Sequence, residues 1–157
     1  MPAANFMPEV LWAAVMRMCE SVRFHFDVDG ENFTSAGQAS VQVKKNLRQL
    51  GIPAETIRRV SIAMYEGEIN MVIHAGGGRA DVIVSEGSIE IILDDDGPGI
   101  ADVELAMREG YSTAPDNIRS LGFGAGMGLP NMKRYTDEMN IETAKGKGTK
   151  ITMRVNL

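Results

Sequence analysis

Apolar and polar residues alternate strictly from Ser21 to Val28. The apolar side chains fall on one face of an extended chain, so this segment is predicted to be a half-buried strand. Short apolar runs between turn residues predict four more strands later in the chain. These are expected to pair as two antiparallel hairpins, residues 80–85 with 88–93 and residues 140–143 with 149–155.

Helical spacing predicts two consecutive helices after the first strand. The pattern Ser35-Ala36-Gly37-Gln38 is typical of a capping box and opens the first helix, which ends at Gly51. Pro53 starts the second helix, which runs to about His74 and stops at three glycines. Two shorter helices are expected at residues 101–109 and 129–139. Between them, residues 110–128 show neither period, and a loop this long in a compact domain is usually functional or disordered.

The second helix is apolar on two sides. Ile57, Val60, Met64 and Met71 fall on one side, and Ile62, Ile69 and Ile73 fall on nearly the opposite side. Glu66 lies among the second set, and Asn70 follows one turn later. A buried carboxylate is costly unless it is paired or bound to a metal, so Glu66 and Asn70 are candidate site residues. The alternative is a helix that turns this polar stripe into water.

An apolar strand, residues 89–93, runs directly into Asp94-Asp95-Asp96 and then Gly97-Pro98-Gly99-Ile100. Three adjacent carboxylates repel one another at a partly desolvated strand end, so local stability does not explain them. They are therefore candidates for binding chemistry. The alternative is an ordinary solvated turn, because Asp and Gly are common turn residues.

Glycines at alternate positions, Gly122, Gly124, Gly126 and Gly128, open directly onto the helix that is expected from Leu129. Glycine lets backbone N–H groups approach a ligand closely. The N-terminus of a helix adds a positive dipole end, which favours an anion such as phosphate. The alternative is a flexible linker.

These segments together suit a nucleoside triphosphate with Mg²⁺. Asp95, at the foot of a strand, can accept a hydrogen bond from an adenine amino group. Asn70 offers an oxygen to Mg²⁺, which takes few protein ligands. Glu66 can take a proton from an attacking hydroxyl, which is the base that phosphoryl transfer needs. Other nucleotide motifs are absent from the sequence, which contains no P-loop and no eukaryotic-type kinase signature.

The composition narrows the class of protein without choosing one. The 157 residues suit one domain, and their net charge of −5 gives no basic footprint for nucleic acid. The single cysteine, Cys19, excludes an internal disulfide and agrees with a reducing cytosol. No apolar run reaches the ~18–20 residues of a membrane helix, and the N-terminus lacks the basic region of a signal peptide. We therefore expect a cytoplasmic domain with no nucleic-acid or membrane partner.

Four segments in a fixed order resemble the motifs of the Bergerat-fold (GHKL) ATPases. Glu66-x-x-x-Asn70 resembles their N box, Asp95-x-Gly97-x-Gly99-Ile100 their G1 box, Gly122-x-Gly124-x-Gly126-x-Gly128-Leu129 their G2 box, and Gly146-Lys147-Gly148-Thr149 their closing Gly-Thr. The resemblance covers residues 21–157. It implies an α/β (α+β) two-layer sandwich, with helices on one face of a mixed, mainly antiparallel sheet and ATP under a flexible lid. Residues 1–20 are left as an N-terminal extension, in which residues 10–19 could form a short apolar helix.

The resemblance also implies roles for individual residues. Glu66 is expected to be the general base, Asn70 to hold Mg²⁺, and Asp95 to read adenine with support from Thr149. The implied cofactors are ATP and Mg²⁺, and Arg119 is either a γ-phosphate contact or an exposed lid charge. The implied nucleotide-binding residues are Asn70, Asp95, Gly97, Gly99, Ile100, Gly122, Gly124, Gly126, Met127, Gly128, Leu129 and Thr149.

Within the superfamily, the chain is most similar to the bacterial anti-sigma-factor serine/threonine kinases. The stretches 108–113, 126–134 and 137–138 are most similar to the stressosome switch kinases of that group. The implied substrate is a Ser or Thr of a STAS-domain antagonist or stressosome scaffold, and a sigma factor, a phosphatase or a second copy are further partners to consider. Two features depart from the pattern, a longer lid at residues 114–121 and the extension at 1–20.

Two other functions remain open at this point. One is a nucleotide-gated module that sequesters a sigma factor or phosphatase with little catalysis. The other is a detached histidine-kinase catalytic domain, which needs a separate protein that carries the acceptor histidine.

Overall fold

The computed structural model describes residue 14 and residues 20–119 and 126–157. The expected N-terminal extension and its helix at residues 10–19 therefore lie almost entirely outside the described residues. Within the described ranges, no helix is both long enough and apolar enough to cross a membrane.

Five strands form one sheet in the order β1-β2-β3-β5-β4. The strands are β1 (Ser21–Asp29), β2 (Gly77–Ser85), β3 (Ser88–Asp95), β4 (Glu138–Thr143) and β5 (Thr149–Asn156). Each pair of neighbours is antiparallel, so the mainly antiparallel sheet and both predicted hairpins are confirmed. Among the described strands no parallel pair occurs.

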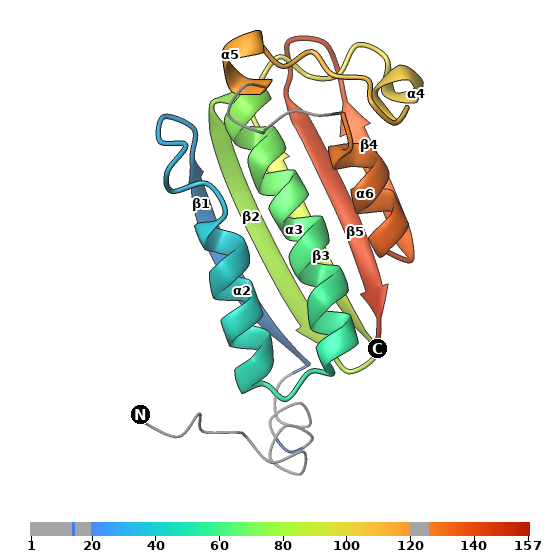
Figure 1. Cartoon of the computed structure of the whole chain (residues 1–157). Helices are drawn as coiled ribbons and strands as arrows, with labels where there is room; N and C mark the ends of the chain where they lie inside the picture. Colours follow the sequence, from blue (N-terminus) through green and yellow to red (C-terminus); the bar gives the residue numbers. More distant parts are fainter. Residues whose placement is uncertain (1–13, 15–19, 120–125) are drawn as a thin grey trace.

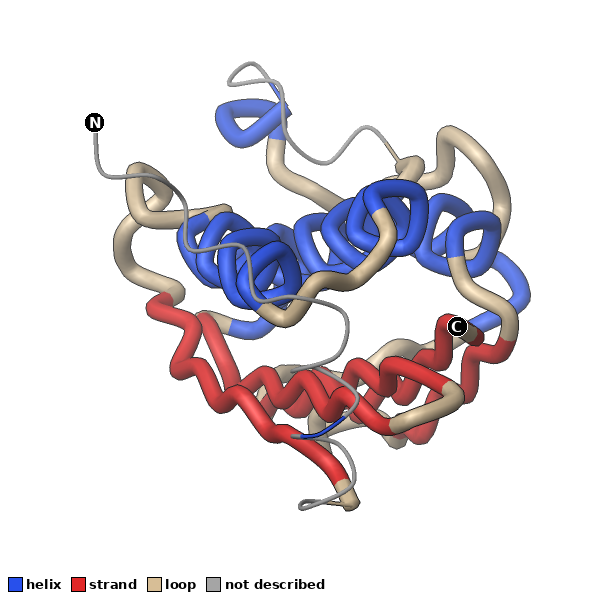
Figure 2. The backbone as a smooth tube through the Cα atoms, turned by 90° about the horizontal axis from the view of Figure 1, so that it is seen from below, coloured by secondary structure: helices blue, strands red, loops and turns tan. Residues whose placement is uncertain are grey.

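Three helices, α2 (Gln38–Gln49), α3 (Ala54–Ala75) and α6 (Gly128–Tyr135), lie in one layer on one face of the sheet (Figures 1 and 2). The predicted two-layer sandwich is confirmed. Two short helices, α4 (Val103–Ala106) and α5 (Asp116–Arg119), lie in the connection between β3 and α6. Helix α3 contacts both of its neighbours in the helix layer and most of the strands. Its residues are therefore placed to line any site between the two layers.

Both sides of α3 are covered, as its two apolar stripes predict. Ile57, Val60, Met64 and Met71 are buried towards the core, and on the other side Ile69 is buried while Ile62 and Ile73 are half-buried. The strands meet them with apolar side chains, of which Val82, Ile91 and Met153 have no exposed surface. Glu66 and Asn70 are half-buried on α3, so the alternative in which this stripe simply faces water is not supported.

Two helices are shorter than predicted. The helix expected at residues 101–109 forms only at Val103–Ala106, where Asp102 caps it by accepting a hydrogen bond from the Leu105 N–H (3.0 Å). The helix expected at 129–139 ends at Tyr135 because Thr136 adopts an extended conformation. The Thr136 hydroxyl donates to the Met132 carbonyl (2.7 Å), which satisfies part of the helix end.

The predicted capping box at Ser35–Gln38 is wrong. The Ser35 hydroxyl donates to the Asn32 carbonyl (2.9 Å), and the N-cap of α2 is Gly37, at φ +96°. The carboxylate of Glu68 on α3 takes over the capping role and accepts hydrogen bonds from the first N–H groups of α2. A tertiary contact has therefore replaced the local one.

Charges alternate across the face of the sheet that points away from the helices. The cross-strand register places Asp27 beside Arg79, Arg79 beside Asp94, Asp94 beside Lys150 and Lys150 beside Glu142. One row across all five strands thus reads acid, base, acid, base, acid. Opposite charges at facing positions stabilise neighbouring strands, whereas like charges would destabilise them.

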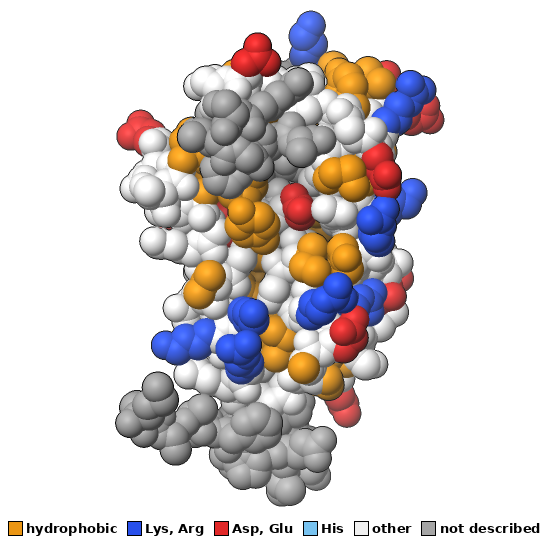
Figure 3. Space-filling view, in the orientation of Figure 1, with side chains coloured by type: hydrophobic (Ala, Val, Ile, Leu, Met, Phe, Trp, Pro, Cys, Tyr) orange, Lys and Arg blue, Asp and Glu red, His pale blue; other side chains and the backbone are white. Residues whose placement is uncertain are grey.

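The helix side of the molecule is mixed in character (Figure 3). Lys and Arg side chains gather over its lower half, where the end of α2 and the start of α3 lie. Hydrophobic side chains lie between them in small groups, and Val41 and Tyr65 are the most exposed of those on α2 and α3 (69% and 41%). Positive charge is therefore local on a chain whose net charge is −5.

Candidate functional site

A pocket of about 440 Å³ lies between α3, the ends of β3 and β5, and the segments on either side of α4. Its floor is apolar and includes Met71, Leu93 and Ile151. Residues predicted for a nucleotide site supply much of the rest. Those that line the pocket are Asn70, Asp95, Gly99, Ile100, Gly126, Gly128, Leu129 and Thr149. All four predicted motif segments thus converge, although they lie far apart in the sequence.

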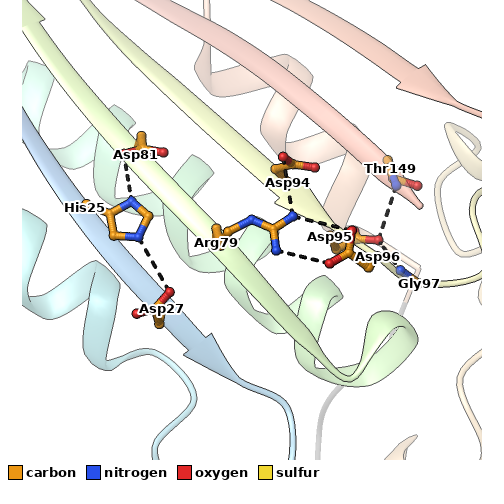
Figure 4. Close-up of polar contacts among 9 residues, drawn as sticks. All are labelled: His25, Asp27, Arg79, Asp81, Asp94, Asp95, Asp96, Gly97 and Thr149. Atoms are coloured by element: carbon orange, nitrogen blue, oxygen red, sulfur yellow. Dashed lines mark hydrogen bonds and ion pairs between the residues drawn. The ribbon is translucent and has the colours of Figure 1, made fainter. Parts of the chain in front are cut away.

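Asp95 is the last residue of β3, and its side chain points to the helix side of the sheet. Its Oδ1 accepts backbone N–H bonds from Gly97 (3.0 Å) and Thr149 (3.2 Å) (Figure 4). Each oxygen of a carboxylate can accept more than one hydrogen bond, so Asp95 keeps capacity for a ligand donor. The two hydrogen bonds from backbone N–H groups fix the orientation of the Asp95 carboxylate towards the pocket.

The acids on either side of Asp95 have a different partner. Arg79 on β2 lies 3.1 Å from Oδ2 of Asp96 and 3.5 Å from Oδ2 of Asp94 (Figure 4). The hydrogen bond from Arg79 holds the pKa of Asp96 below its ordinary value, and the positive charge acts in the same direction. Side chains alternate along a strand, so Asp94 faces away from the pocket and Asp95 faces into it.

Thr143 supports the end of the pocket at Ile100 and Thr149 without lining it, and it was not predicted from the sequence. Its Oγ1 accepts the Ile100 N–H (2.9 Å), donates to the Gly148 carbonyl (3.1 Å) and lies 3.0 Å from Oγ1 of Thr149. A hydroxyl has one proton, so Thr149 donates to Thr143 in this arrangement. The Thr149 oxygen then has acceptor capacity for water or an amino group at the pocket.

Gly99 is required by its surroundings. It has φ +75°, and a Cβ on it would lie 2.3 Å from the Ala144 carbonyl oxygen. The turn after the three acids is therefore packed against the hairpin of β4 and β5, which no residue with a side chain could match. This close approach keeps Ile100 at the pocket wall.

Asn70 forms the α3 side of the pocket and packs directly on α6. A Cβ on Gly128 would lie 2.9 Å from both the Nδ2 and the Oδ1 of Asn70, so any side chain at the start of α6 would push the Asn70 amide aside. Leu129 is buried beside it and lines the pocket. Met127 is the N-cap of α6 and does not line the pocket; its carbonyl accepts the Asn131 N–H (2.9 Å).

Glu66 lies one helical turn from Asn70, just outside the residues that line the pocket. It is half-buried, and its Oε1 accepts a hydrogen bond from Nδ2 of Asn131 on α6 (3.0 Å). Asn131 was not singled out in the sequence, because a lone Asn on a short helix carries no recognisable signal. Gly97 also lies outside the pocket lining, and its N–H donates a hydrogen bond to the Asp95 carboxylate.

His74 lies at the pocket, one turn after Asn70 on α3. The residue is exposed, although its position at the pocket desolvates part of the ring. This desolvation lowers the pKa of His74 below its ordinary value, and the negative charge of Asp95 opposes the shift. His74 is therefore expected to lose its proton at a lower pH than a free imidazole.

Three predicted features cannot be placed. Gly122 and Gly124 lie outside the described residues, as does the side chain of Arg119. In the described ranges, no group of three or more His, Cys, Asp and Glu side chains is placed to hold a metal. Asn70 lines the pocket, and its amide oxygen is a donor that could hold Mg²⁺, an ion that prefers phosphate oxygens and water as its remaining ligands.

The sequence is similar to those of two bacterial regulatory proteins. An anti-sigma F factor of Clostridium novyi is 38% identical over 125 residues, which cover 76% of this chain and 84% of the relative. The serine/threonine-protein kinase RsbT of Bacillus subtilis is 32% identical over 118 residues, which cover 72% and 83%.

Solved structures with low identity share the fold. The structure of the RsbU and RsbW domains of a Mycobacterium tuberculosis protein has a TM-score of 0.58 at 16% identity, and covers 85% of this chain and 32% of that one. The SiaB–SiaC complex from Pseudomonas aeruginosa gives 0.53 at 9%, with 95% and 98% covered.

The family model for the histidine kinase-like ATPase domain matches residues 31–155. That range contains all the boxes on which the resemblance was based, and the predicted resemblance to the GHKL superfamily and its anti-sigma kinases is confirmed. With the match spanning most of its length, the chain belongs to the histidine kinase-like ATPase domain family.

Proposed function

We propose that this chain is an ATP:protein serine/threonine kinase. It phosphorylates a STAS-domain antagonist and switches partners in a bacterial stress or sporulation pathway. The observation that carries the proposal is the meeting of Asn70 of α3, Asp95 of β3 and Gly128 of α6 at one pocket. The printed names of the relatives, an anti-sigma F factor and a serine/threonine-protein kinase, support this class of reaction.

One end of the pocket binds the adenine of the nucleotide, and the other end binds its phosphates. Asp95, with Oδ1 held by two N–H groups, accepts the adenine amino group, and the Thr149 hydroxyl adds an acceptor beside it. The apolar floor suits the flat faces of a base. At the other end, Gly126 and Gly128 precede and begin α6, where backbone N–H groups favour phosphate oxygens.

The donors present fit a magnesium ion on the phosphates. Asn70 lines the pocket with its amide, and Gly128 leaves that amide room beside the start of α6. When bound, Mg²⁺ neutralises charge that develops on the phosphates. Asn70 fixes its position from the protein side.

Glu66 has the role of general base. It takes the proton of the acceptor Ser or Thr hydroxyl, whose oxygen bonds to the γ-phosphorus while the bond to the bridging oxygen breaks and ADP leaves. Glu66 lies just outside the pocket, one turn along α3 from Asn70, which is where an acceptor side chain would approach the end of the triphosphate. General-base catalysis contributes about 10²–10⁴-fold to the rate.

The test measures nucleotide binding and phosphate transfer separately. The purified chain is incubated with γ-labelled Mg-ATP and a bacterial STAS-domain antagonist protein. We expect Glu66→Gln to keep nucleotide affinity and lose transfer by about 10²–10⁴-fold, and Asn70→Ala to lose Mg-dependent binding. Asn140→Ala, an exposed change on β4, is the matched control and should alter neither. Normal transfer by Glu66→Gln would remove the proposed role of that residue.

The name of the anti-sigma F relative favours one second function, sequestration of a sigma factor under nucleotide control. An ATP-dependent complex with no label on any partner would favour this binding module. Acid-labile phosphate on a histidine, in place of acid-stable phosphate on Ser or Thr, would identify a detached histidine-kinase domain instead.

A further inference from the structure

We propose that Asn131 is a positioning residue for the general base of this kinase. The proposal rests on the proposed function, because it assigns to Asn131 the task of holding Glu66 in the orientation that accepts the proton. Its Nδ2 donates to Oε1 of Glu66 at 3.0 Å, and both side chains are half-buried.

The amide orientation is determined by its partner. With the amide turned over, Oδ1 would face the carboxylate oxygen at the same distance, and two acceptors would repel each other. Only the orientation with Nδ2 towards Glu66 makes a hydrogen bond. A single N–H contact occupies part of one oxygen, so the carboxylate keeps acceptor capacity for the hydroxyl proton of a substrate.

The backbone beneath Asn131 is held in place. Helices α6 and α3 lie side by side and contact each other (Figures 1 and 2). They meet at two levels, Gly128 against Asn70 and Asn131 against Glu66. Steps of three residues on α6 and four on α3 are each about one helical turn, so the two contacts belong to one helix–helix interface.

Holding Glu66 matters because its side chain is otherwise free to leave the reactive geometry. A Glu side chain has several rotatable bonds and loses considerable entropy when fixed. Proton transfer requires the base within hydrogen-bond reach of the hydroxyl, and small misplacements are costly. Asn131 thus confines the base through a rigid element that also contacts the Mg²⁺ ligand.

The experiment is a double-mutant cycle on the complete chain. Asn131→Leu removes the donor at similar size, and we expect kcat for transfer to fall about 10- to 100-fold while the Kd for Mg-ATP stays the same. Asn131→Asp, which places a second carboxylate beside the first, should lower kcat further. In the Glu66→Gln background, Asn131→Leu should cause no additional loss, because a residue that acts through another has no effect once that other is gone.

A purely structural role predicts a different pattern. It would lower kcat by the same factor in both backgrounds and shift the urea midpoint of unfolding, and either an additive cycle or unchanged kcat in Asn131→Leu would overturn the positioning role. Lys133→Leu, an exposed change on the same helix, is the matched control.

A second readout does not depend on transfer. The side-chain amide resonance of Asn131 should move in Glu66→Ala if the hydrogen bond exists in solution, and an unmoved resonance would overturn the contact. A wild-type chain that shows this contact but transfers no phosphate would overturn the proposed function, and the positioning role with it. Intact transfer with an additive cycle would overturn the positioning role alone.

Discussion

Glu68 on α3 holds the first turn of α2 through Ser40, which donates its backbone N–H (3.1 Å) and its hydroxyl (2.7 Å) to Oε2. Oε1 accepts the N–H groups of Gly37 (2.9 Å) and Ala39 (3.1 Å). The Glu68 residue is 2% exposed. A buried carboxylate with four donors around it satisfies the free N–H groups of a helix start in place of a local cap.

Replacing Glu68 with Gln should destabilise the fold. The amide would turn one acceptor into a donor that faces N–H groups, so we expect the free energy of unfolding to fall by about 2 kcal/mol, the scale of a hydrogen bond to a charged group. Urea denaturation measures it. Glu55→Gln, an exposed acid in the first turn of α3, is the control and should shift the free energy by less than about 0.5 kcal/mol. Equal midpoints for wild type and Glu68→Gln would contradict the capping role.

Asp95→Asn should weaken ATP binding while the fold is kept. The Asn side chain still has an oxygen to accept the N–H groups of Gly97 and Thr149, but it loses the charge that strengthens a bond to the adenine amino group. We expect a rise in Kd of about 10- to 100-fold by calorimetry, the equivalent of a charged hydrogen bond. Asp96→Asn is the control, because Asp96 is exposed and paired with Arg79. Equal affinity in both variants would remove Asp95 from the site.

Gly128→Ala should separate binding from stability. A Cβ at this position would lie 2.9 Å from the Asn70 amide, so the amide must move and Mg-dependent nucleotide affinity should fall by about 10-fold or more. The backbone of Gly128 is helical, so alanine costs nothing in conformation and helix propensity favours it. Calorimetry and thermal unfolding measure the two effects. Gly87→Ala, in a turn with open space around it, is the control; unchanged affinity in Gly128→Ala would contradict the packing argument.

The pKa values of the two histidines should be shifted in opposite directions from the ordinary value. The hydrogen bond from His25 to Asp81 (2.9 Å) raises the pKa of His25 above its ordinary value, whereas desolvation lowers that of His74. The His25 pair therefore contributes stability below about pH 6.5 and loses it as the pH rises through the folded-state pKa. NMR titration of the imidazole resonances measures both values.

Two changes test the causes of these shifts. Asp81→Asn should return the pKa of His25 towards its ordinary value and leave that of His74 unchanged. Addition of Mg-ATP should perturb the His74 resonance, because His74 lines the pocket, and not that of His25 on the open face of the sheet. A nucleotide effect on His25 alone would place the binding site elsewhere.

Features with a regular period or a local stop signal could be predicted from the sequence. The alternation from Ser21 to Val28 matches β1, and Pro53 and the glycines after Ala75 bound α3 as expected. The spacing of glycines and acids in the four motif segments predicted where the pocket residues lie. It did so because that spacing reflects a backbone geometry in which close approaches require glycine. Residues from all four of these segments line one pocket.

Features that depend on contacts between distant residues could not be predicted. Glu68 caps a helix that precedes it, and Thr143 and Asn131 act through single hydrogen bonds to other elements. The helix predicted at residues 129–139 was too long for a related reason, because its end depends on a contact with the sheet. Met132 and Met139 are seven residues apart and suit one continuous helix, but Thr136 starts the extended chain that joins the sheet.

The three adjacent acids at the end of β3 lie in two different environments. Asp94 and Asp96 share one guanidinium on the outer side of the sheet, while Asp95 alone faces the cavity. Of these three carboxylates, only that of Asp95 is therefore presented to a ligand in the pocket, and the proposed nucleotide would meet one acid of the turn rather than three. The alternation of side chains along β3 and the positive charge of Arg79 thus make an acidic turn compatible with a negatively charged ligand.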